Sequence, residues 1–415
     1  MTAAVLSIGT ELTRGELTNS NASWLSEQLT ALGFEVQEHL TVDDDIPRIV
    51  EAVRRLAERH QVVVATGGLG PTTDDLTTEA VARAMGVPVQ RDPAVVEHIQ
   101  NLATWYGRSL TPNNLKQADF PAGAEVLDNE RGTAPGFGVS IGGSKLFFMP
   151  GVPREMQHIF EARIVPRIAS LVVRTSHQIH LRTFGLGESA LGQKLDGVEA
   201  MFPGVTVGYR ASFPEVELKV HARADSITEA VQLAERAAEE VKRRASDVIY
   251  GDREDTYPGA IGRTLRDRGL TVALAESCTG GMLGSMLTSV PGSSEYLLFD
   301  AVVYANSAKT HVLGVNEETL RAYGAVSEET ALAMVRGVLR CSGADLGIAV
   351  TGVAGPGGGT DEKPVGTVWI GVGNASGQLF ARHFLFRGNR ERIRIMSAYT
   401  ALRLVKDLAL GREPI

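Results

Sequence analysis

Cysteine is nearly absent from this chain, which has 2 cysteines among 415 residues. So few cysteines exclude a disulfide scaffold and favour a reducing compartment such as the cytoplasm. No apolar run approaches the ~20 residues that a membrane helix needs, and the N-terminus lacks the basic segment that opens a signal peptide. The sequence therefore predicts a cytoplasmic protein that has no membrane partner.

An excess of positive charge is also missing. The 41 basic and 49 acidic residues leave a net charge of −8, and an acidic chain is poorly suited to binding along a phosphate backbone. The composition therefore argues against nucleic acid as a partner. The fractions of hydrophobic residues (43%) and charged residues (22%) are those of a globular protein, and the length predicts two or three domains.

Strand-like runs alternate with helical periodicity in both the first and the last part of the chain, which is typical of α/β domains with parallel sheets. The predicted strands are Val5–Ile8, Val62–Ala65, Leu146–Met149, Thr271–Ala275, Leu298–Tyr304, Leu346–Val350 and Val365–Val372. The predicted helices include Ile46–Leu56, Glu328–Leu339 and Arg390–Leu408.

The pattern changes between residues 171 and 250. Ile179–Phe184 and Val216–Ala222 have strand-like alternation, and Ile227–Arg244 has the period of a long amphipathic helix, so we expect a small α+β module. Residues 251–259 are polar and contain glycine and proline, which indicates a linker. The predicted domains are therefore 1–170, 171–250 and 260–415, with the linker at 251–259.

A glycine-rich loop follows the strand that ends at Ala65. In an open parallel sheet, ligands bind beyond the carboxyl ends of the strands, and Gly67, Gly68 and Gly70 would let backbone N–H groups approach a phosphate. Carboxylates beside a phosphate often hold a bridging cation, so Asp74 and Asp75 are candidate metal ligands. They could equally cap the next helix.

The last domain contains serines, a tyrosine and a lysine in polar, glycine-rich clusters, but its motifs lack a His–Asp pair. This composition favours a Ser–Lys nucleophilic site. Ser277 and Cys278 compete with Ser294 as nucleophile; Cys278 has no activating histidine in motif spacing, so we interpret it as a small buried residue.

Thr66-Gly67-Gly68-Leu69-Gly70 and Asp75-Leu76-Thr77 resemble the loop of the molybdopterin-binding fold. Further motifs resemble the CinA (competence/damage-inducible) family, whose middle module is KH-like. They are Gly9-Thr10-Glu11-Leu12, Asn129–Gly136, Met149–Met156, Ala275–Gly281, Tyr304–Lys309, Val350–Pro356 and Lys363–Val368.

The resemblance implies two chemistries, and we expect the chain to form a homodimer. The first domain would hydrolyse the pyrophosphate of ADP-ribose with a divalent metal ion bound by Asp75. The last would deamidate nicotinamide mononucleotide without a cofactor. The implied ADP-ribose site comprises Thr10, Glu11, Gly67, Gly68, Gly70, Thr72, Asn129 and Thr133.

For deamidation the resemblance makes Ser294 the nucleophile, and Lys309 with Tyr304 its proton acceptor. The residues expected to bind the mononucleotide are Ser277, Thr279, Gly280, Thr351, Gly355 and Arg390. Two alternatives stay open: a non-enzymatic binding protein in competence or DNA repair, and a protein that handles molybdopterin. The KH-like segment contains no Gly-x-x-Gly loop, which counts against nucleic-acid binding.

Overall fold

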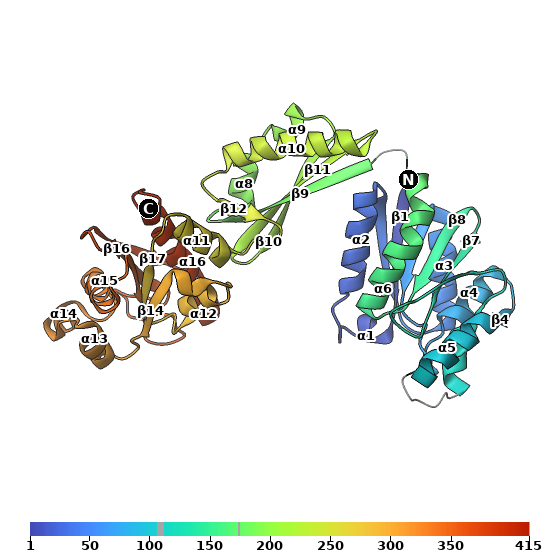
Figure 1. The fold of residues 1–415 in the computed structure, drawn as a ribbon, viewed down its shortest axis with the longest axis horizontal. Helices are drawn as coiled ribbons and strands as arrows, with labels where there is room; N and C mark the ends of the chain where they lie inside the picture. The colour runs from blue at the N-terminus through green and yellow to red at the C-terminus, as the bar shows by residue number, and fades with distance from the viewer. Residues whose placement is uncertain (106–111, 173–174, 415) are drawn as a thin grey trace. The chain divides into compact units, whose positions relative to one another are not determined.

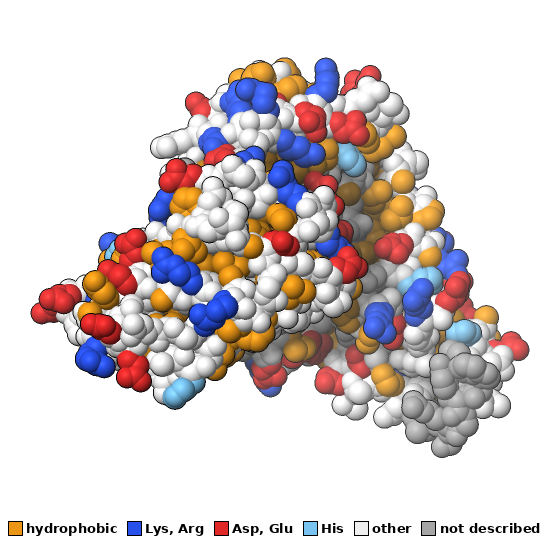
Figure 2. Space-filling model, turned by 60° about the vertical axis from the view of Figure 1, so that its left-hand side comes forward, with side chains coloured by type: hydrophobic (Ala, Val, Ile, Leu, Met, Phe, Trp, Pro, Cys, Tyr) orange, Lys and Arg blue, Asp and Glu red, His pale blue; other side chains and the backbone are white. Residues whose placement is uncertain are grey.

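The computed structural model describes residues 1–105, 112–172 and 175–414 (Figure 1). By its contacts the chain divides into two compact units, Met1–Gln178 with His221–Arg236, and Ile179–Val220 with Ala237–Ile415. Acidic and basic side chains are interspersed over the face shown in Figure 2. In the part of the chain that is described, we find no helix with both the length and the apolar character of a membrane span.

The first sheet has six strands and combines parallel with antiparallel pairing. Its order is β2 (Glu35–Val42), β1 (Thr2–Ile8), β3 (Val62–Thr66), β8 (Ser144–Met149), β7 (Gly136–Ile141) and β6 (Glu125–Leu127). The pairs among β2, β1, β3 and β8 are parallel, whereas β7 and β6 are added antiparallel. The carboxyl ends of the four parallel strands therefore lie at one edge.

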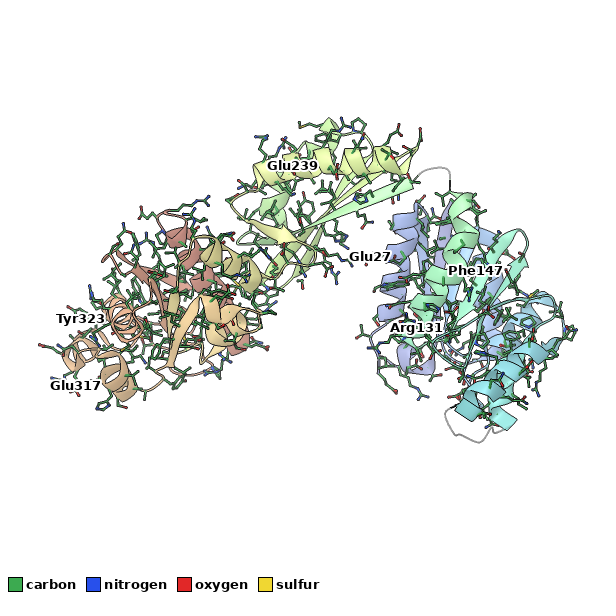
Figure 3. All side chains as sticks on the ribbon, in the orientation of Figure 1. Glu27, Arg131, Phe147, Glu239, Glu317 and Tyr323 are labelled. Carbon is green, nitrogen blue, oxygen red and sulfur yellow. The ribbon has the colours of Figure 1, made fainter. Side chains whose placement is uncertain are left out.

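Helices cover both faces of this sheet because successive strand residues point to opposite sides. On β1, Leu6 packs with α3 and α4 on one face, and Val5 packs with α2 and α6 on the other. Phe147 on β8 is labelled in Figure 3. The helices are α1 (Thr10–Thr13), α2 (Ser20–Leu32), α3 (Ile46–Arg59), α4 (Thr77–Met85), α5 (Pro93–Trp105), α6 (Pro153–Ile159) and α7 (Val165–Ile168).

Shorter elements complete this part of the chain. They are β4 (Val89–Arg91), which pairs antiparallel with β5 (Asp119–Pro121), the 3-10 helices η1 (Pro112–Ala118) and η3 (Ala169–Leu171), and the π-helix η2 (Phe160–Ile164).

The second sheet has four strands in the order β10 (Val205–Ser212), β11 (Glu215–Ala224), β9 (Thr175–Phe184) and β12 (Ile249–Asp252). Its helices are α8 (Glu188–Lys194), α9 (Val198–Met201) and α10 (Ile227–Arg244). The expected linker at 251–259 is shorter in the structure. Gly251 pairs with β9, and Thr256 caps helix α11 by accepting from the Gly259 N–H at 3.2 Å, so only residues 253–256 lie between elements.

The third sheet has five strands in the order β14 (Leu297–Val302), β13 (Val272–Glu276), β15 (Leu346–Gly352), β16 (Thr367–Asn374) and β17 (Leu379–Leu385). The strands β14, β13 and β15 are parallel, and β16 and β17 are antiparallel. The helices are α11 (Tyr257–Asp267), α12 (Met282–Thr288), α13 (Asn306–Leu313), α14 (Glu317–Tyr323), α15 (Glu328–Ser342) and α16 (Arg390–Ala409), with the short η4 (Ser293–Glu295).

Two apolar layers enclose this third sheet. Residues of α11, α12 and α16 pack on one face around Leu274, and residues of α13 and α15 pack on the other around Ala275. The predicted α/β class, with its small α+β module, is confirmed. The strand predicted at Val365–Val372 forms as β16, and it pairs antiparallel rather than parallel.

Candidate active sites

The loops that follow β1, β3 and β8 surround a pocket of about 640 Å³ at the carboxyl edge of the first sheet. Of the predicted residues, the pocket is lined by Glu11, Gly67, Gly68, Gly70, Thr72, Asp74, Asp75 and Thr133. Thr10 and Asn129 do not line it, but both hydrogen-bond to carboxylates that do. The structure therefore gathers the predicted residues around one space.

The glycine-rich loop owes its course to close backbone packing. Gly67 has φ 108°, and a Cβ at this position would overlap the carbonyl oxygen of Ile8, so only glycine fits here. Buried Thr77 fastens the loop from the next helix: its Oγ1 donates to the Gly67 carbonyl at 2.9 Å, and its N–H donates to Gly68 O at 3.2 Å. The threonine of the Asp-x-Thr motif thus shapes the loop.

Asp75 is fixed inside the loop and does not cap α4. Its Oδ2 accepts from the Thr72 N–H at 2.8 Å and from Thr72 Oγ1 at 2.6 Å. Helix α4 begins at Thr77 with Leu76 in the N-cap position. The single hydroxyl proton of Thr72 is shared between Asp75 and Asp74, and this hydrogen bond lowers the pKa of the exposed Asp74 carboxyl.

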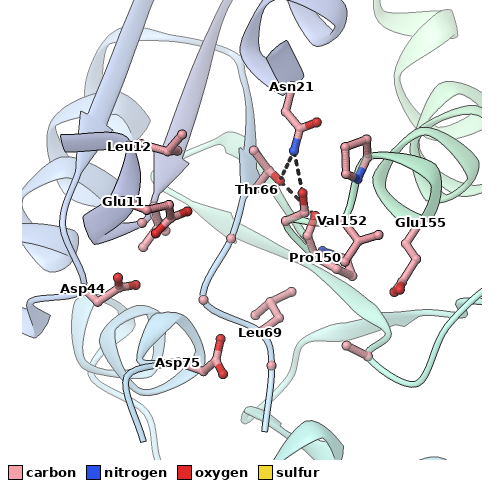
Figure 4. A pocket seen from close by; sticks show the side chains of 18 of the residues that line it. Glu11, Leu12, Asn21, Asp44, Thr66, Leu69, Asp75, Pro150, Val152 and Glu155 are labelled. Atoms are coloured by element: carbon pink, nitrogen blue, oxygen red, sulfur yellow. Dashed lines mark hydrogen bonds between the residues drawn. The ribbon is translucent and has the colours of Figure 1, made fainter. Parts of the chain in front are cut away.

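Two pocket carboxylates were not predicted from the sequence. Asp44 follows β2, and its Oδ2 accepts from the N–H (2.8 Å) and the Oγ1 (2.9 Å) of Thr10. Glu155 lies in the first turn of α6 and accepts from Asn129 Nδ2 at 2.6 Å. In Figure 4, Glu11, Asp44 and Asp75 lie on one side of the glycine loop, and Glu155 lies on the other. The sequence signal that could have identified Asp44 and Glu155 is that each follows the end of a predicted or observed strand.

The second site is built around Lys309 at the carboxyl edge of the third sheet. Its side chain is only 1% exposed. The Nζ donates to Ser277 Oγ at 3.0 Å and to the carbonyls of Val303 (2.9 Å) and Tyr304 (3.2 Å). Burial lowers the pKa of Lys309, because none of these three partners is a carboxylate and desolvation disfavours the ammonium.

The structure does not bring Ser294 to Lys309. Ser294 is exposed in η4, which precedes β14, whereas Lys309 follows β14 in α13. Because β13 is parallel to β14, the residue beside Lys309 comes from the end of β13, and that residue is Ser277. The expected pairing of Lys309 with Ser294 is therefore wrong.

Tyr304 also differs from the expectation. Its carbonyl contacts Lys309, but its side chain is 63% exposed, so the phenol does not share the lysine's buried position. Cys278 is buried as predicted, and burial raises the pKa of its thiol to about 12. The thiol therefore stays protonated at neutral pH and is a poor nucleophile.

Buried Glu276 organises the loop that carries Ser277. Its carboxylate accepts from the N–H groups of Gly281 (3.0 Å) and Gly284 (2.8 Å), which ties the strand end to the start of α12. Gly280 and Gly281 have φ 60° and 88°, a left-handed path that favours glycine. The loop after β13 is thus held in one conformation beside the Ser277–Lys309 pair.

Two arginines at the start of α16 reach the surrounding loops. Arg390 Nη1 donates to the Gly355 carbonyl at 2.7 Å. Arg394, which was not predicted, donates to the Thr279 carbonyl through Nη2 at 2.6 Å and Nε at 3.2 Å. The Thr279 hydroxyl is buried and has no hydrogen-bond partner among the described residues. Arg394 could have been identified from the sequence because it lies four residues after Arg390, on the same face of α16.

Of the remaining predicted ligand-binding residues, Thr351 is buried at the end of β15, where its Oγ1 donates to the Ala325 carbonyl at 2.7 Å. The hydroxyl therefore braces the loop before α15 in the present structure.

Three family models match successive parts of the chain. The model described as "Probable molybdopterin binding domain" matches residues 4–170, "Damage-inducible protein CinA KH domain" matches 178–251, and "CinA C-terminal domain" matches 254–409. A CinA-like protein of Desulfosudis oleivorans is 42% identical over 98% of this chain and 99% of its own length. A CinA-like protein of Citrifermentans bemidjiense is 40% identical over 100% of this chain and 99% of its own.

Solved structures match parts of the chain. The competence/damage inducible protein CihA from Agrobacterium tumefaciens is 40% identical over 38% of this chain and 98% of its own, with a TM-score of 0.36. The molybdopterin biosynthesis enzyme MoaB from Thermus thermophilus is 21% identical over 41% of this chain and 94% of its own, with a TM-score of 0.28. The full-length sequence identities, rather than these TM-scores, relate the chain to its relatives.

Proposed function

Because the chain belongs to the CinA family, we propose that it is a bifunctional hydrolase of pyridine nucleotides. Its last domain deamidates nicotinamide mononucleotide to nicotinic acid mononucleotide and ammonia, and its first domain hydrolyses the pyrophosphate of ADP-ribose. The observation that carries the proposal is the contact of buried Lys309 with Ser277 Oγ at 3.0 Å. A lysine without a carboxylate partner, hydrogen-bonded to a serine, suits nucleophilic attack on an amide.

Ser277 acts as the nucleophile and Lys309 as the base. In its neutral form Lys309 can donate two N–H groups to the carbonyls of Val303 and Tyr304, and its lone pair takes the proton of the Ser277 hydroxyl while Oγ bonds to the carboxamide carbon. Lys309 then gives this proton to the departing nitrogen, and ammonia leaves an acyl-enzyme. Lys309 then takes a proton from water as the water oxygen bonds to the acyl carbon, the bond between that carbon and Oγ breaks, and Lys309 returns the proton to Ser277 Oγ as the carboxylate product leaves. Burial, which lowers the pKa of Lys309, raises the fraction of the amine that can accept a proton at neutral pH.

The phosphate of the mononucleotide needs cationic partners near the serine. Arg390 and Arg394 lie one turn apart at the start of α16 and contact the loops after β15 and β13. Guanidinium groups suit phosphate oxygens because they donate in a planar fork. The buried Thr279 hydroxyl has no protein partner among the described residues, so it is available to hydrogen-bond a ligand.

In the first domain the carboxylates suit a metal ion shared with phosphate. Among the described residues, no three His, Cys, Asp or Glu side chains gather closely enough to form a metal cage. Magnesium-like ions in phosphate sites commonly use one or two carboxylates together with substrate oxygens and water. Asp75 and Asp44 face the same space (Figure 4) and would hold such an ion. The ion would neutralise charge on the pyrophosphate.

Assembly as a cytoplasmic homodimer is part of the same proposal. The edge strand β14 presents Leu298 (49% exposed) and Val302 (51% exposed) on one face, and Tyr304 follows them two residues on. Exposed large apolar side chains that gather in this way are typical of interfaces. Light scattering coupled to size-exclusion chromatography would measure the mass, and a mass equal to the 44.4 kDa monomer would contradict the dimer.

Product analysis tests both activities on the full-length protein. With nicotinamide mononucleotide we expect equal amounts of ammonia and nicotinic acid mononucleotide, formed also in the presence of a chelator. With ADP-ribose we expect AMP and ribose 5-phosphate, formed only with an added divalent ion. Failure to release ammonia would overturn the deamidase proposal. Intact ADP-ribose in the presence of magnesium, manganese, cobalt or nickel would overturn the hydrolase proposal.

A further inference from the structure

Glu155 lies apart from the other carboxylates of the first pocket. It lies in the first turn of α6, directly after the loop that follows β8. Figure 4 shows its side chain on the opposite side of the glycine loop from Asp44 and Asp75. The carboxylates of Asp44 and Asp75 suit a cation. Glu155 faces them across the pocket and is not needed as a ligand of that cation.

The position of Glu155 is set by Asn129, which is only 4% exposed. Its Nδ2 donates to Glu155 Oε2 at 2.6 Å and to the Ala134 carbonyl at 2.9 Å, and its Oδ1 accepts from the Arg131 N–H at 3.0 Å. The whole amide is therefore used to hold one loop against one carboxylate oxygen. Gly132 packs so closely on this carboxylate that a Cβ there would overlap it.

The surroundings of Glu155 make it a stronger base than an exposed glutamate. Burial raises the pKa of its carboxyl, and the hydrogen bond from Asn129 offsets only part of that effect. Its Oε1 receives no hydrogen bond from the described residues, and the side chain lines the pocket. A carboxylate that is hydrogen-bonded through one oxygen can accept a proton from a water molecule at the other.

We propose that Glu155 is the general base that activates water for hydrolysis of the pyrophosphate, and that Asn129 positions it. This role rests on the proposed function of the first domain. Glu155 takes one proton from water as the water oxygen bonds to phosphorus. The bridging P–O bond breaks, and its electron pair stays on the oxygen of the leaving phosphate. Glu155 then returns its proton to solvent.

A purely structural role for Glu155 is the competing explanation. An acidic residue in the first turn stabilises a helix, and the Asn129 contact ties a loop to α6. Replacing a structural glutamate would lower stability without changing how the rate depends on pH. A general base makes the rate rise with pH as the base ionises. The other ionisable groups lining this pocket are Glu11, Asp44, Asp74 and Asp75.

The test compares Glu155→Gln and Glu155→Ala with Glu130→Gln in the full-length protein, using ADP-ribose and a divalent ion. Glu130 is on the same loop as Asn129, but its carboxylate bonds to Arg163 at 2.8 Å and does not line this pocket. We expect Glu155→Gln to lower kcat on the order of 100-fold or more, to keep the KM within about threefold as unchanged binding requires, and to lose the acidic limb of the pH profile. Glu130→Gln should keep kcat within about twofold of the wild-type value, because Glu130 is exposed and lies outside this pocket.

Chemical rescue separates a base from a structural residue. Formate added to Glu155→Ala should restore activity in proportion to its concentration, because a small carboxylate can occupy the vacated space. The base role alone is overturned if Glu155→Gln keeps its activity. It is also overturned if the variants lose activity, formate does not restore it and the acidic limb of the pH profile remains. In both cases the wild type still hydrolyses ADP-ribose. A wild type that does not hydrolyse ADP-ribose overturns the proposed function and the base role together. Thermal unfolding shows whether each variant is folded.

Discussion

Replacing Ser277 with alanine is the sharpest test of the deamidase site. The substitution removes the hydroxyl that contacts Lys309 at 3.0 Å and leaves the loop's other contacts in place. Ser294→Ala is the matched control, because Ser294 is a serine of the same domain that is exposed in η4. The family resemblance assigns the nucleophile to Ser294, whereas the contact with Lys309 assigns it to Ser277. The two variants decide between these assignments.

The structure sets the size of both effects. Ser277→Ala loses one hydrogen bond, about 1 kcal/mol of stability, while Lys309 keeps the carbonyls of Val303 and Tyr304. The variant should therefore fold. Loss of a nucleophile lowers kcat on the order of 1000-fold or more, equivalent to about 4 kcal/mol of transition-state stabilisation. Ser294→Ala, at an exposed position, should change stability by less than about 0.5 kcal/mol.

Ammonia release from nicotinamide mononucleotide measures kcat and KM for both variants, and thermal unfolding measures their stability. We expect Ser277→Ala to unfold within a few degrees of the wild type and to release no measurable ammonia. Ser294→Ala should match the wild type in both assays. A folded Ser277→Ala variant with wild-type turnover would refute the Ser277–Lys309 mechanism. Loss of activity in Ser294→Ala would restore the assignment made from sequence.

Three further predictions concern the same two sites. Lys309→Arg should not deamidate, because arginine stays protonated. In the wild type kcat/KM should fall as the pH drops through the lowered pKa of Lys309. A Lys309→Arg variant that deamidates at the wild-type rate would contradict the base role. Cys278→Ala should keep ammonia release within a few-fold, since its thiol, with a pKa of about 12, is not ionised at neutral pH; an inactive but folded variant would contradict this. Asp75→Asn should raise the metal concentration needed for ADP-ribose hydrolysis and leave deamidation unchanged, and a parallel loss of both activities would show that the sites are coupled.

Much of the fold could be predicted from apolar periodicity. The helix predicted at Ile227–Arg244 has those same bounds, and the strand predicted at Val62–Ala65 extends by only one residue. These elements have strong periodic patterns and clear flanking signals. The pairing direction of β16 could not be read in this way, because a buried strand has the same pattern whether it pairs parallel or antiparallel.

The first pocket was predictable where its chemistry lies in one continuous motif. The glycine loop and Asp75 lie within ten residues of sequence, and the structure places them around one pocket. Asp44 and Glu155 reach the same pocket from other strand ends, and neither belongs to a motif that names a carboxylate role. Their part depends on sheet order, because β2 and β8 are brought beside β1 and β3 only by strand pairing.

The assignment of Ser294 shows how strand geometry constrains a site before any side chain is placed. Ser294 precedes β14 and Lys309 follows it, and six residues of strand span about 20 Å at ~3.3 Å per residue. A hydrogen bond needs about 3 Å, so the two side chains cannot meet across an extended strand. Parallel strands end at one edge, and a nucleophile for Lys309 must therefore follow a neighbouring strand. β13 is that neighbour, and Ser277 is the residue directly after it.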